Sequence, residues 1–469
     1  MIWDLNKYAE NKALIDDSGN SLSYSDLHEE TDILYRKIGR RCLVFSLCQN
    51  EIGSVVGYVS FMNHSVVPVL LNSHIDEELL FNLIGIYKPA YIWAPADLKD
   101  RFEGFEEVYE RFAYVLLKSG SKIEYPLFEE LGLLLTTSGS TGSPKFVRQS
   151  YLNVKNNAEA IVSYLELDET EKPISTLPMN YTYGLSIINS HLLVGACILL
   201  TEKGIMWKEF WSFFTKEGAT SFGGVPYTYE MLNKLGFYKR ELPSLRTMTQ
   251  AGGKILPELH EKFARYAQEN GKRFIVMYGQ CEATARMGYL PADMALAKKG
   301  SMGIPIPGGR FSLIDADGNE IHEPFVTGEL VYEGKNVTMG YAECGEDLIK
   351  GDERGGILET GDMAQFDEDG YYYIVGRKKR FLKIFGNRVN LDEIDRLVKE
   401  RFGIEAVSAG KDDHMYIFIT ESEFGNDVVR FVSGKTNLNP NAFKAIVIDE
   451  IPKNDAGKVL YKELNKYYE

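Results

Sequence analysis

Apolar and polar residues follow one another along the chain in blocks that are typical of an α/β protein. Short apolar runs lie at residues 43–47, 66–71 and 91–95, and a helix-like segment lies at residues 76–86. This alternation predicts a parallel sheet covered by helices. Further helices are expected at residues 152–165 and 391–402. Strand-turn segments are expected at residues 174–184, 196–200 and 219–226, and two further strands at residues 245–253 and 274–279.

Other parts of the chain follow different patterns. Residues 1–40 indicate a helix, a short hairpin around residues 17–20 and a second helix that begins near Ser23 to Asp26. From Gly300 to Tyr373, short strands separated by turn pairs such as Asp317-Gly318 indicate a β-rich region. The chain then passes through a basic, glycine-containing segment into a mixed α+β tail.

The expected fold class is therefore α/β, with a domain boundary at about Lys379. We expect a large N-terminal domain of helix-covered sheets at residues 1–378, with a small β-rich subdomain at residues 300–375, and a small, mobile α+β C-terminal domain at residues 379–469.

Composition and charge narrow the function classes. The chain has 469 residues, of which 44% are hydrophobic and 25% charged, so it can form a large core and more than one domain. Its net charge of −15 disfavours nucleic acid or an anionic membrane as a partner. Five scattered cysteines favour neither a disulfide framework nor a zinc site. With no signal-peptide pattern and no apolar window long enough to span a bilayer, a cytoplasmic enzyme is expected.

The strongest candidate for chemistry is the stretch LLLTTSGSTGSPK, from Leu133 to Lys145. After a strand-like leucine run, six hydroxyls, two glycines and a lysine fall within ten residues. Glycines allow close backbone approach, hydroxyls donate hydrogen bonds and the lysine adds a positive charge, so the loop can wrap an anion. A flexible linker is the alternative. The common phosphate loop is excluded, because Pro144 precedes the lysine and Phe146 follows it.

The loop resembles the phosphate-binding motif of the adenylate-forming superfamily, which contains acyl-CoA synthetases, peptide-synthetase adenylation domains and firefly-type luciferases. Further segments resemble motifs of that superfamily and occur in its order. They are Gln250-Ala251-Gly252-Gly253, Tyr278-Gly279-Gln280-Cys281-Glu282, Thr360-Gly361-Asp362, Gly376-Arg377 and the stretch from Ile451 to Lys458. Taken alone, Glu282 could be a surface group and Gly361-Asp362 an ordinary turn.

The resemblance implies a nucleotide site and a catalytic set. The loop residues Thr136, Thr137, Ser138, Gly139, Ser140, Thr141, Gly142 and Lys145 would hold the ATP phosphates. Gly252, Gly253, Tyr278 and Gly279 would flank adenine, and Asp362, Ile374 and Arg377 would lie at the ribose side. Glu282 and Thr137 would bind Mg²⁺, and Lys458 would bridge the substrate carboxylate and the α-phosphate. Lys379 would be the hinge between the domains, and Lys458, Glu282, Lys145 and Thr137 the catalytic residues.

The acid is less specified. No acidic residue lies between Asn180 and Ser186, where amino-acid-activating relatives carry an aspartate, so an α-amino acid is disfavoured. Aromatic and apolar residues make up the candidate acyl pocket and favour a small or medium acyl or aryl carboxylate. They are Tyr181, Tyr183, Gly184, Phe222, Gly223 and Val225.

The resemblance leaves the acyl acceptor open. Coenzyme A is the simplest acceptor, because the sequence has no phosphopantetheine-attachment motif of its own. The alternative is a stand-alone adenylation enzyme that loads the phosphopantetheine of a separate carrier protein. Two remote alternatives are a non-catalytic nucleotide-binding regulator and a luciferase-like oxygenase.

Overall fold

The computed structural model describes the chain apart from residues 1, 122, 137–144, 379, 386, 454–458 and 469 and the side chains of Phe381 and Arg388. The chain divides into two compact units, of which the first comprises Met1–Phe311 and Tyr332–Leu358 and the second Ser312–Val331 and Glu359–Glu469. The expected boundary at about Lys379 falls inside the second unit, at a position outside the described residues, and stays a prediction.

The first unit contains an eight-stranded sheet with the order β19-β9-β8-β4-β3-β5-β7-β6. Its centre is parallel, because β3 runs parallel to β4 and β5, and β4 runs parallel to β8. All six residues of β3 are buried, as expected for a strand covered on both faces. The strands are β3 (Leu43–Cys48), β4 (Val67–Asn72), β5 (Tyr91–Pro95), β6 (Glu106–Arg111), β7 (Tyr114–Lys118), β8 (Leu131–Thr136), β9 (Phe146–Ser150) and β19 (Tyr341–Ala342).

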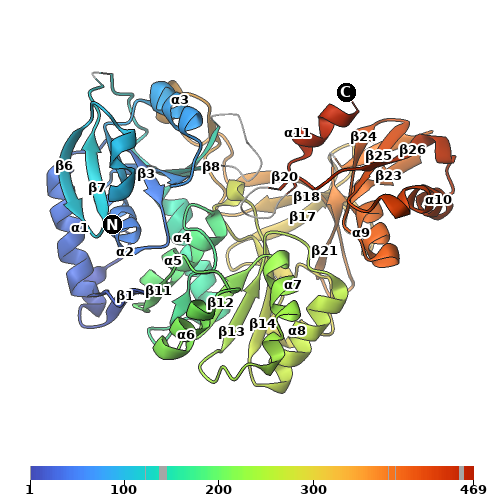
Figure 1. Cartoon of the computed structure of the whole chain (residues 1–469), viewed down its shortest axis with the longest axis horizontal. Helices are drawn as coiled ribbons and strands as arrows, with labels where there is room; N and C mark the ends of the chain where they lie inside the picture. Colours follow the sequence, from blue (N-terminus) through green and yellow to red (C-terminus); the bar gives the residue numbers. More distant parts are fainter. Residues whose placement is uncertain are drawn as a thin grey trace. The chain divides into compact units, whose positions relative to one another are not determined.

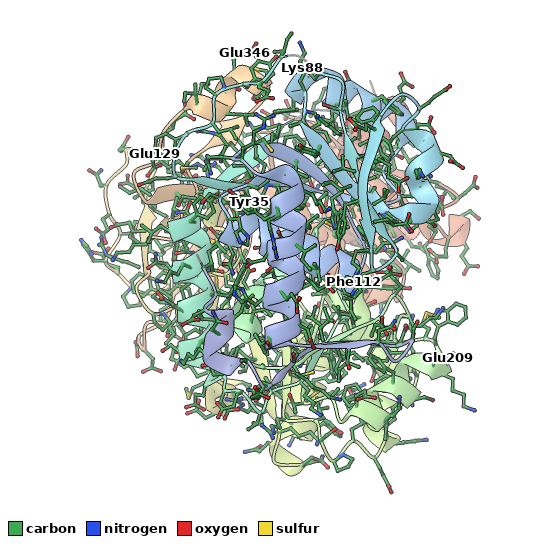
Figure 2. All side chains as sticks on the ribbon, turned by 90° about the vertical axis from the view of Figure 1, so that its left-hand side faces the viewer. Tyr35, Lys88, Phe112, Glu129, Glu209 and Glu346 are labelled. Atoms are coloured by element: carbon green, nitrogen blue, oxygen red, sulfur yellow. The ribbon has the colours of Figure 1, made fainter. Side chains whose placement is uncertain are left out.

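Helices α1 (Tyr24–Ile38), α2 (Ile52–Asn63) and α3 (Glu77–Tyr87) belong to this part of the unit. Helix α1 begins where the sequence predicts a helix start, because Ser23 and Asp26 form a reciprocal capping box. Figure 2 shows Tyr35 on this helix, and its ring stacks on His64 with the centroids 4.4 Å apart.

A nine-stranded sheet in the same unit has the order β16-β15-β14-β13-β12-β10-β11-β1-β2. Its central strands β12, β13 and β14 are parallel. The strands are β1 (Lys12–Asp16), β2 (Ser21–Ser23), β10 (Pro173–Ile174), β11 (Ile198–Leu200), β12 (Ser221–Gly224), β13 (Thr247–Gln250), β14 (Arg273–Tyr278), β15 (Gly288–Tyr289) and β16 (Ile304–Pro305). The helices are α4 (Tyr151–Leu165), α5 (Thr182–Leu193), α6 (Lys208–Glu217), α7 (Pro226–Lys234) and α8 (Pro257–Glu269), shown beside these strands in Figure 1.

Strand β14 is buried on both faces. Ile275 and Met277 share an apolar cluster with residues of α4 and α5. Phe274 contacts the rings of Tyr229 on α7 and Phe263 on α8. Helices therefore cover both faces of this sheet, which confirms the predicted arrangement.

Two local expectations are wrong. The strand-like signal predicted for residues 174–184 ends at Ile174, and α5 already begins at Thr182. Nearly every residue of α5 is buried, so its sequence lacks the polar face by which an amphipathic helix is recognised. Near the start of the chain, the expected first helix is only the short 3₁₀ turn Leu5–Tyr8.

The second unit holds most of a four-stranded sheet with the order β17-β18-β20-β21, made by β17 (Arg310–Ile314), β18 (Gly328–Glu333), β20 (Ile357–Phe366) and β21 (Tyr372–Arg377). It continues with the hairpin β22 (Phe381–Ile384) and β23 (Asn387–Asn390), helix α9 (Leu391–Phe402) and helix α10 (Gly425–Thr436). A three-stranded sheet comprises β24 (Ala406–Lys411), β25 (His414–Ile419) and β26 (Phe443–Val447), and α11 (Tyr461–Leu464) follows. One apolar cluster is formed entirely by residues 382–445. No helix in the described parts of either unit is long and apolar enough to cross a membrane.

Packing at Gly57 on α2 generates a stability prediction. An added Cβ there would lie 2.3 Å from Nε1 of Trp93, which donates to the carbonyl of Gly53 at 2.9 Å. We expect Gly57→Ala to lower the free energy of unfolding by about 1–3 kcal/mol, because the indole cannot retreat without breaking that bond.

The matched control is Gly85→Ala on α3, where an added Cβ meets nothing within 4 Å. This substitution should be neutral or stabilise by up to about 1 kcal/mol. Urea unfolding followed by circular dichroism measures both changes. Equal midpoints for the two variants would contradict the packing at Trp93.

Candidate active site

Glu282 lies at the carboxyl end of β14, on a short 3₁₀ turn formed by Cys281–Ala283. The backbone amide of Thr338 donates to its carbonyl oxygen at 3.0 Å, and Nη1 of Arg354 donates to the same oxygen at 2.9 Å. The hydroxyl of Tyr341 donates to Oε1 of the Glu282 carboxylate at 2.8 Å. Both the backbone and the carboxylate of Glu282 are therefore held from the segment at residues 338–354.

The turn that follows Glu282 has an unusual backbone. Thr284 is buried and has φ +65°, in a region that a β-branched residue rarely adopts. The Thr284 hydroxyl donates to the carbonyl of Asn336 at 2.7 Å, and the Thr284 carbonyl accepts a hydrogen bond from the hydroxyl of Thr182. The Asn336 amide donates in turn to the carbonyls of Ala283 and Arg286, at 2.9 and 3.1 Å. Such a strained turn persists only where its surroundings determine it at several points.

The ring of Tyr341 contacts two cations. Nζ of Lys145 lies 3.6 Å from the ring centroid, and the guanidinium carbon of Arg354 lies 4.8 Å from it. Lys145 also lies 3.6 Å from the exposed carboxylate of Glu343. Burial, together with the neighbouring Glu282 carboxylate, raises the pKa of the Tyr341 phenol to about 12. The hydroxyl therefore stays protonated, and able to donate to Glu282, across the neutral range.

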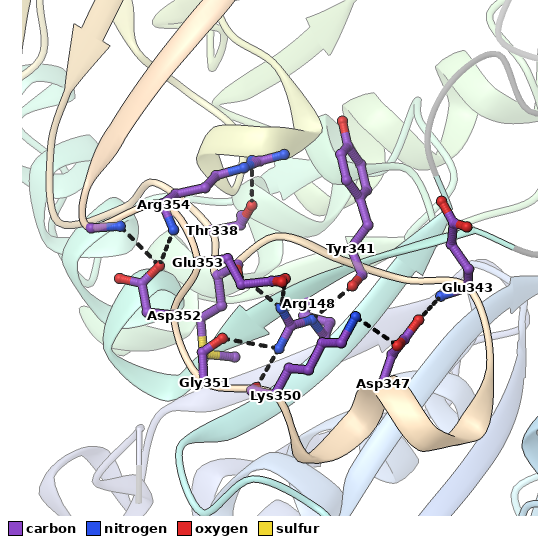
Figure 3. A network of polar contacts seen from close by, with 12 residues as sticks. Arg148, Thr338, Tyr341, Glu343, Asp347, Lys350, Gly351, Asp352, Glu353 and Arg354 are labelled. Carbon is purple, nitrogen blue, oxygen red and sulfur yellow. Dashed lines mark hydrogen bonds and ion pairs between the residues drawn. The ribbon is translucent and has the colours of Figure 1, made fainter.

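Arg148 on β9 fixes the segment that carries Tyr341 (Figure 3). Its fully buried guanidinium donates to the backbone carbonyls of Tyr341 and Met339, both at 3.0 Å, and of Gly351 at 3.1 Å. It also donates to the carbonyl of Lys350 and to the carboxylate of Glu353. Since β9 begins directly after Lys145, one side chain connects the strand after the predicted phosphate loop with the segment that holds Glu282.

The glycines predicted at the adenine side are required by close packing. A Cβ on Gly279 would lie 1.7 Å from the carbonyl oxygen of Ala285. Gly252 has φ +83°, and a Cβ there would lie 2.6 Å from the hydroxyl of Tyr181. At Gly253, a Cβ would lie 3.1 Å from a ring carbon of Pro226. Tyr278 ends β14 beside them and accepts a hydrogen bond at 3.2 Å from Gln280.

The candidate acyl residues fall into two groups. The rings of Tyr181 and Tyr183 lie edge to face with their centroids 6.4 Å apart. Val225 lies close to Gly252, because a Cβ added at Gly252 would be 3.1 Å from Cγ1 of Val225. The hydroxyls of Tyr183 and Thr249 form a hydrogen bond at 2.8 Å. A Cβ added at Gly223 would lie 2.9 Å from the Tyr183 hydroxyl.

Phe222 and Gly184 lie differently. Side chains alternate along β12, so Phe222 points to the opposite face, against Tyr229 and Phe237 at 6.2 and 5.9 Å. The structure does not bring Phe222 to the group around Tyr183. A Cβ on Gly184 would lie 2.3 Å from the carbonyl oxygen of Pro178, so this glycine permits a close backbone approach.

Within the second unit, Asp362 and Arg377 are directly opposite each other on β20 and β21. Nε of Arg377 lies 3.3 Å from Oδ1 of the buried Asp362 carboxylate. Ile374 pairs with Ala364 in the same ladder. The structure thus brings together the three residues predicted at the ribose side.

Several predicted residues lie outside the described part of the chain: Thr137, Ser138, Gly139, Ser140, Thr141 and Gly142 of the loop, the hinge residue Lys379 and the catalytic lysine Lys458. Their roles stay predictions. Of the loop, the structure describes Thr136, at the end of β8, and Lys145.

Next to the predicted hinge, Arg380 is buried inside the second unit. Its guanidinium lies 2.8 Å from Asp392 and 2.6 Å from Asp395 on α9, and 4.3 Å from the Tyr461 ring centroid. Burial raises the pKa of the Asp395 carboxyl, and the Arg380 cation opposes this effect. These contacts of Arg380 were not predicted from the sequence.

The chain is similar in sequence to known proteins. The family model described as AMP-binding enzyme matches residues 2–342. A 2-succinylbenzoate–CoA ligase from Bacillus cereus is 29% identical over 450 residues, which cover 92% of this chain and 89% of the relative. A probable CoA ligase from Humulus lupulus and an oxalate–CoA ligase from Arabidopsis thaliana are each 28% identical, with 70% of this chain aligned. The aligned region spans 65% of the length of each plant protein.

A solved structure shares the fold. The O-succinylbenzoate coenzyme A synthetase from Bacillus subtilis in complex with AMP matches with a TM-score of 0.79 and 20% identity. The match covers 98% of this chain and 96% of that one. The predicted α/β fold class is thereby confirmed.

The contacts of Arg148 predict a large effect on stability. Arg148→Met removes the donors of five acceptors, including a carboxylate, and we expect it to lower the free energy of unfolding by about 3–5 kcal/mol. Arg265→Met is the control, because Arg265 makes an exposed i,i+4 pair with Glu261, and such a pair contributes about 0.5 kcal/mol. Denaturant midpoints of the two variants provide the measurement. If both midpoints shift alike, Arg148 is not a main support of this region.

Proposed function

The chain belongs to the AMP-binding enzyme family, and we propose that it is an AMP-forming acid–thiol ligase. In this reaction a carboxylate oxygen attacks the α-phosphorus of ATP, pyrophosphate leaves and an acyl-adenylate forms. The thiol of coenzyme A then attacks the acyl carbon, giving a thioester and AMP. The observation that carries this proposal is the connection, through Tyr341, of the Glu282 carboxylate with the lysine of the predicted phosphate loop.

Charge explains why such a site is needed. A carboxylate is a weak nucleophile and faces an anionic triphosphate, so the enzyme must neutralise and align both. Lys145 supplies a positive charge where the phosphate loop ends, and its contact with the Tyr341 ring limits its movement. Lys458 is proposed to stabilise charge at the α-phosphate during the first step.

The residues present fit a magnesium ion held mainly by the nucleotide. Among the described residues, no group of three or more His, Cys, Asp or Glu side chains could hold a metal ion. Mg²⁺ in nucleotide sites usually takes one or two carboxylates together with phosphate oxygens and water, and the Glu282 carboxylate meets that requirement. When bound, the ion would neutralise phosphate charge. Thr137 is its second proposed ligand.

At the nucleoside end, Asp362 and Arg377 are proposed to bind the ribose. A carboxylate suits a vicinal diol, because each of its oxygens can accept a hydrogen bond from one hydroxyl. Arg377 pairs with this carboxylate, since its Nε lies 3.3 Å from Oδ1 of Asp362.

Coenzyme A is the proposed acceptor, and a small or medium acid without an α-amino group is the proposed substrate. The named relatives support this class, since they are called CoA ligases. Two of them are named for oxalate and 2-succinylbenzoate, acids that carry two carboxylates. The described neighbours of Tyr183, which include Tyr181, Thr249 and the Arg286 cation, offer no carboxylate as a partner for a substrate ammonium.

Pyrophosphate release with ATP, Mg²⁺ and a panel of carboxylic acids, each with and without coenzyme A, tests the function. We expect sustained turnover only when both an acid and coenzyme A are present. A stoichiometric burst unaffected by coenzyme A would instead support loading of a carrier protein. Absence of release with every acid would contradict the enzymatic proposal.

Variants of lysines in the same assay test the catalytic assignments. Lys458→Ala should lower the rate of adenylate formation by roughly 10²–10³-fold, the usual effect of losing one transition-state donor. Lys453→Ala is the matched control, since Lys453 pairs with Glu405. If Lys458→Ala leaves adenylate formation intact while Lys145→Ala abolishes it, the assignment of Lys458 fails.

Tyr341 offers a sharper test of the described geometry. Tyr341→Phe keeps the ring against Lys145 but removes the hydrogen bond to Glu282, and should raise the KM for Mg·ATP about 3–10-fold. Tyr341→Ala removes both contacts and should raise it further.

A pH series adds a second readout for the same pair. Because the Tyr341 pKa is raised to about 12, its hydroxyl donates at every pH below that value. The ratio of the wild-type and Phe-variant KM values should therefore be constant from pH 6 to 9. A ratio that changes over this range, or equal KM values for the two substitutions, would contradict the proposed arrangement.

A further inference from the structure

Arg286 carries a buried positive charge that meets only neutral groups. The residue is 3% exposed. Its Nε donates to the hydroxyl of Ser186 at 3.1 Å, and its Nη1 contacts the hydroxyl of Tyr164 at 3.0 Å and the sulfur of Met277 at 2.8 Å. The guanidinium carbon lies 5.0 Å from the ring centroid of Tyr183.

Other buried charged side chains of the described residues have partners of opposite charge. Arg148 pairs with Glu353, Glu171 with Arg246, Glu329 with Lys378, Asp362 with Arg377, and Arg380 with Asp392 and Asp395. Within the same described set, no carboxylate pairs with Arg286, and its Nη2 makes no hydrogen bond.

Titratable neighbours do not supply the missing charge. Burial raises the pKa of the Tyr183 phenol to about 12, so it remains neutral near pH 7. The Tyr164 phenol is also neutral, since burial raises its pKa. Burial, with the Arg286 cation, lowers the pKa of His191 to about 4, so this imidazole is neutral as well. One uncompensated positive charge therefore remains in this part of the first unit.

Such a charge is unfavourable unless something binds to it. Removing a guanidinium from water costs several kcal/mol of solvation free energy, and hydrogen bonds to neutral hydroxyls offset only part of this cost. A carboxylate stabilises the buried cation most strongly, because it carries the opposite charge and its two oxygens accept a pair of parallel hydrogen bonds from the guanidinium. The free Nη2 leaves an edge of the guanidinium for that geometry.

The location connects this charge with the proposed acyl site. Arg286 contacts Tyr183, a buried aromatic side chain of the candidate acyl pocket. It also follows Glu282 by four residues, so their Cα atoms lie at most about 14 Å apart even for an extended chain. An acid whose reacting carboxylate lies near Glu282 could therefore place a second anionic group at Arg286 only if the acid is short or of medium length.

We propose that Arg286 binds a second carboxylate of the acid, and that the preferred substrates are dicarboxylic acids of small to medium size. This inference rests on the proposed ligase function and specifies its substrate class. The second carboxylate forms charge-assisted hydrogen bonds with the guanidinium, while the rings of Tyr181 and Tyr183 contact the part of the acid between its two carboxylates.

The experiment compares dicarboxylates with neutral analogues of the same shape. Succinate, glutarate and phthalate are each paired with their monoamides, and kcat/KM is measured by pyrophosphate release in the presence of coenzyme A. The wild-type enzyme should favour at least one dicarboxylate over its monoamide by about tenfold or more, because the amide leaves the buried cation unpaired.

Variants at Arg286 identify the residue responsible. Arg286→Met should lower the dicarboxylate-to-monoamide ratio of kcat/KM by about 10²-fold, and Arg286→Lys should restore part of it, since lysine keeps the charge without the planar pair of donors. Arg273→Met is the control, because Arg273, at the start of β14, already pairs with the carboxylate of Glu166. Thermal unfolding verifies that each variant is folded.

The outcomes separate this inference from the function on which it rests. A wild-type enzyme that uses the monoamides as well as the dicarboxylates would overturn the inference alone. An unchanged ratio in Arg286→Met, with both classes of acid affected alike, would also overturn it and leave Arg286 a structural role. Absence of pyrophosphate release with every acid would overturn the ligase function, and this inference with it.

Discussion

One buried guanidinium determines the path of the segment that holds Glu282 in the first unit. Arg148 makes its hydrogen bonds chiefly to backbone carbonyls of residues 339–351, so it fixes the path of a segment and not merely the position of one side chain. That segment carries Tyr341, which orients Glu282, and Thr338 and Arg354, which bind the Glu282 backbone. A cation is suited to this task, because a guanidinium has five N–H donors in a fixed plane and carbonyls converging from several directions can all be satisfied. Burial without those partners would be strongly unfavourable, so the guanidinium and the path of the segment stabilise each other.

Local motifs led from the sequence to residues that the structure holds in constrained positions, while their roles in a site stay predictions. Glycines at 252 and 279 are found where close packing excludes any side chain, and Asp362 faces Arg377 because the turn between two adjacent strands brings them into register. Helix α9 has the predicted bounds, since a clear apolar stripe and Asn390 as its N-cap mark it. Helix α5 was missed because it is buried on nearly all sides, and periodicity carries no signal when there is no polar face.

Long-range contacts with the backbone could not be predicted. The acceptors of Arg148 lie about 200 residues away in sequence and are carbonyl oxygens, which every residue has. Tyr341 was not identified either, because its role depends on β19 pairing with β9, which the short strand Tyr341–Ala342 does not signal. Phe222 shows the opposite case: it neighbours Gly223, but strand alternation turns its ring to the other face. That alternation could have been applied to the sequence alone once β12 was recognised.

The strained turn at Thr284 joins the two charged groups on which the proposed substrate specificity depends. Glu282 precedes it and Arg286 follows it, and Asn336 binds the carbonyls of both Ala283 and Arg286. A flexible turn would let the Arg286 guanidinium move toward water, where its charge is best solvated. Because the backbone is held at several points, the cation stays buried against Tyr183, and its distance from the Glu282 carboxylate is set by the fold. In the proposed site a fixed separation would select acids by length, since a second carboxylate would pair with the cation only when the acid reaches from the reaction centre to Arg286. The backbone strain at this turn is thus consistent with a site that selects its substrate by length.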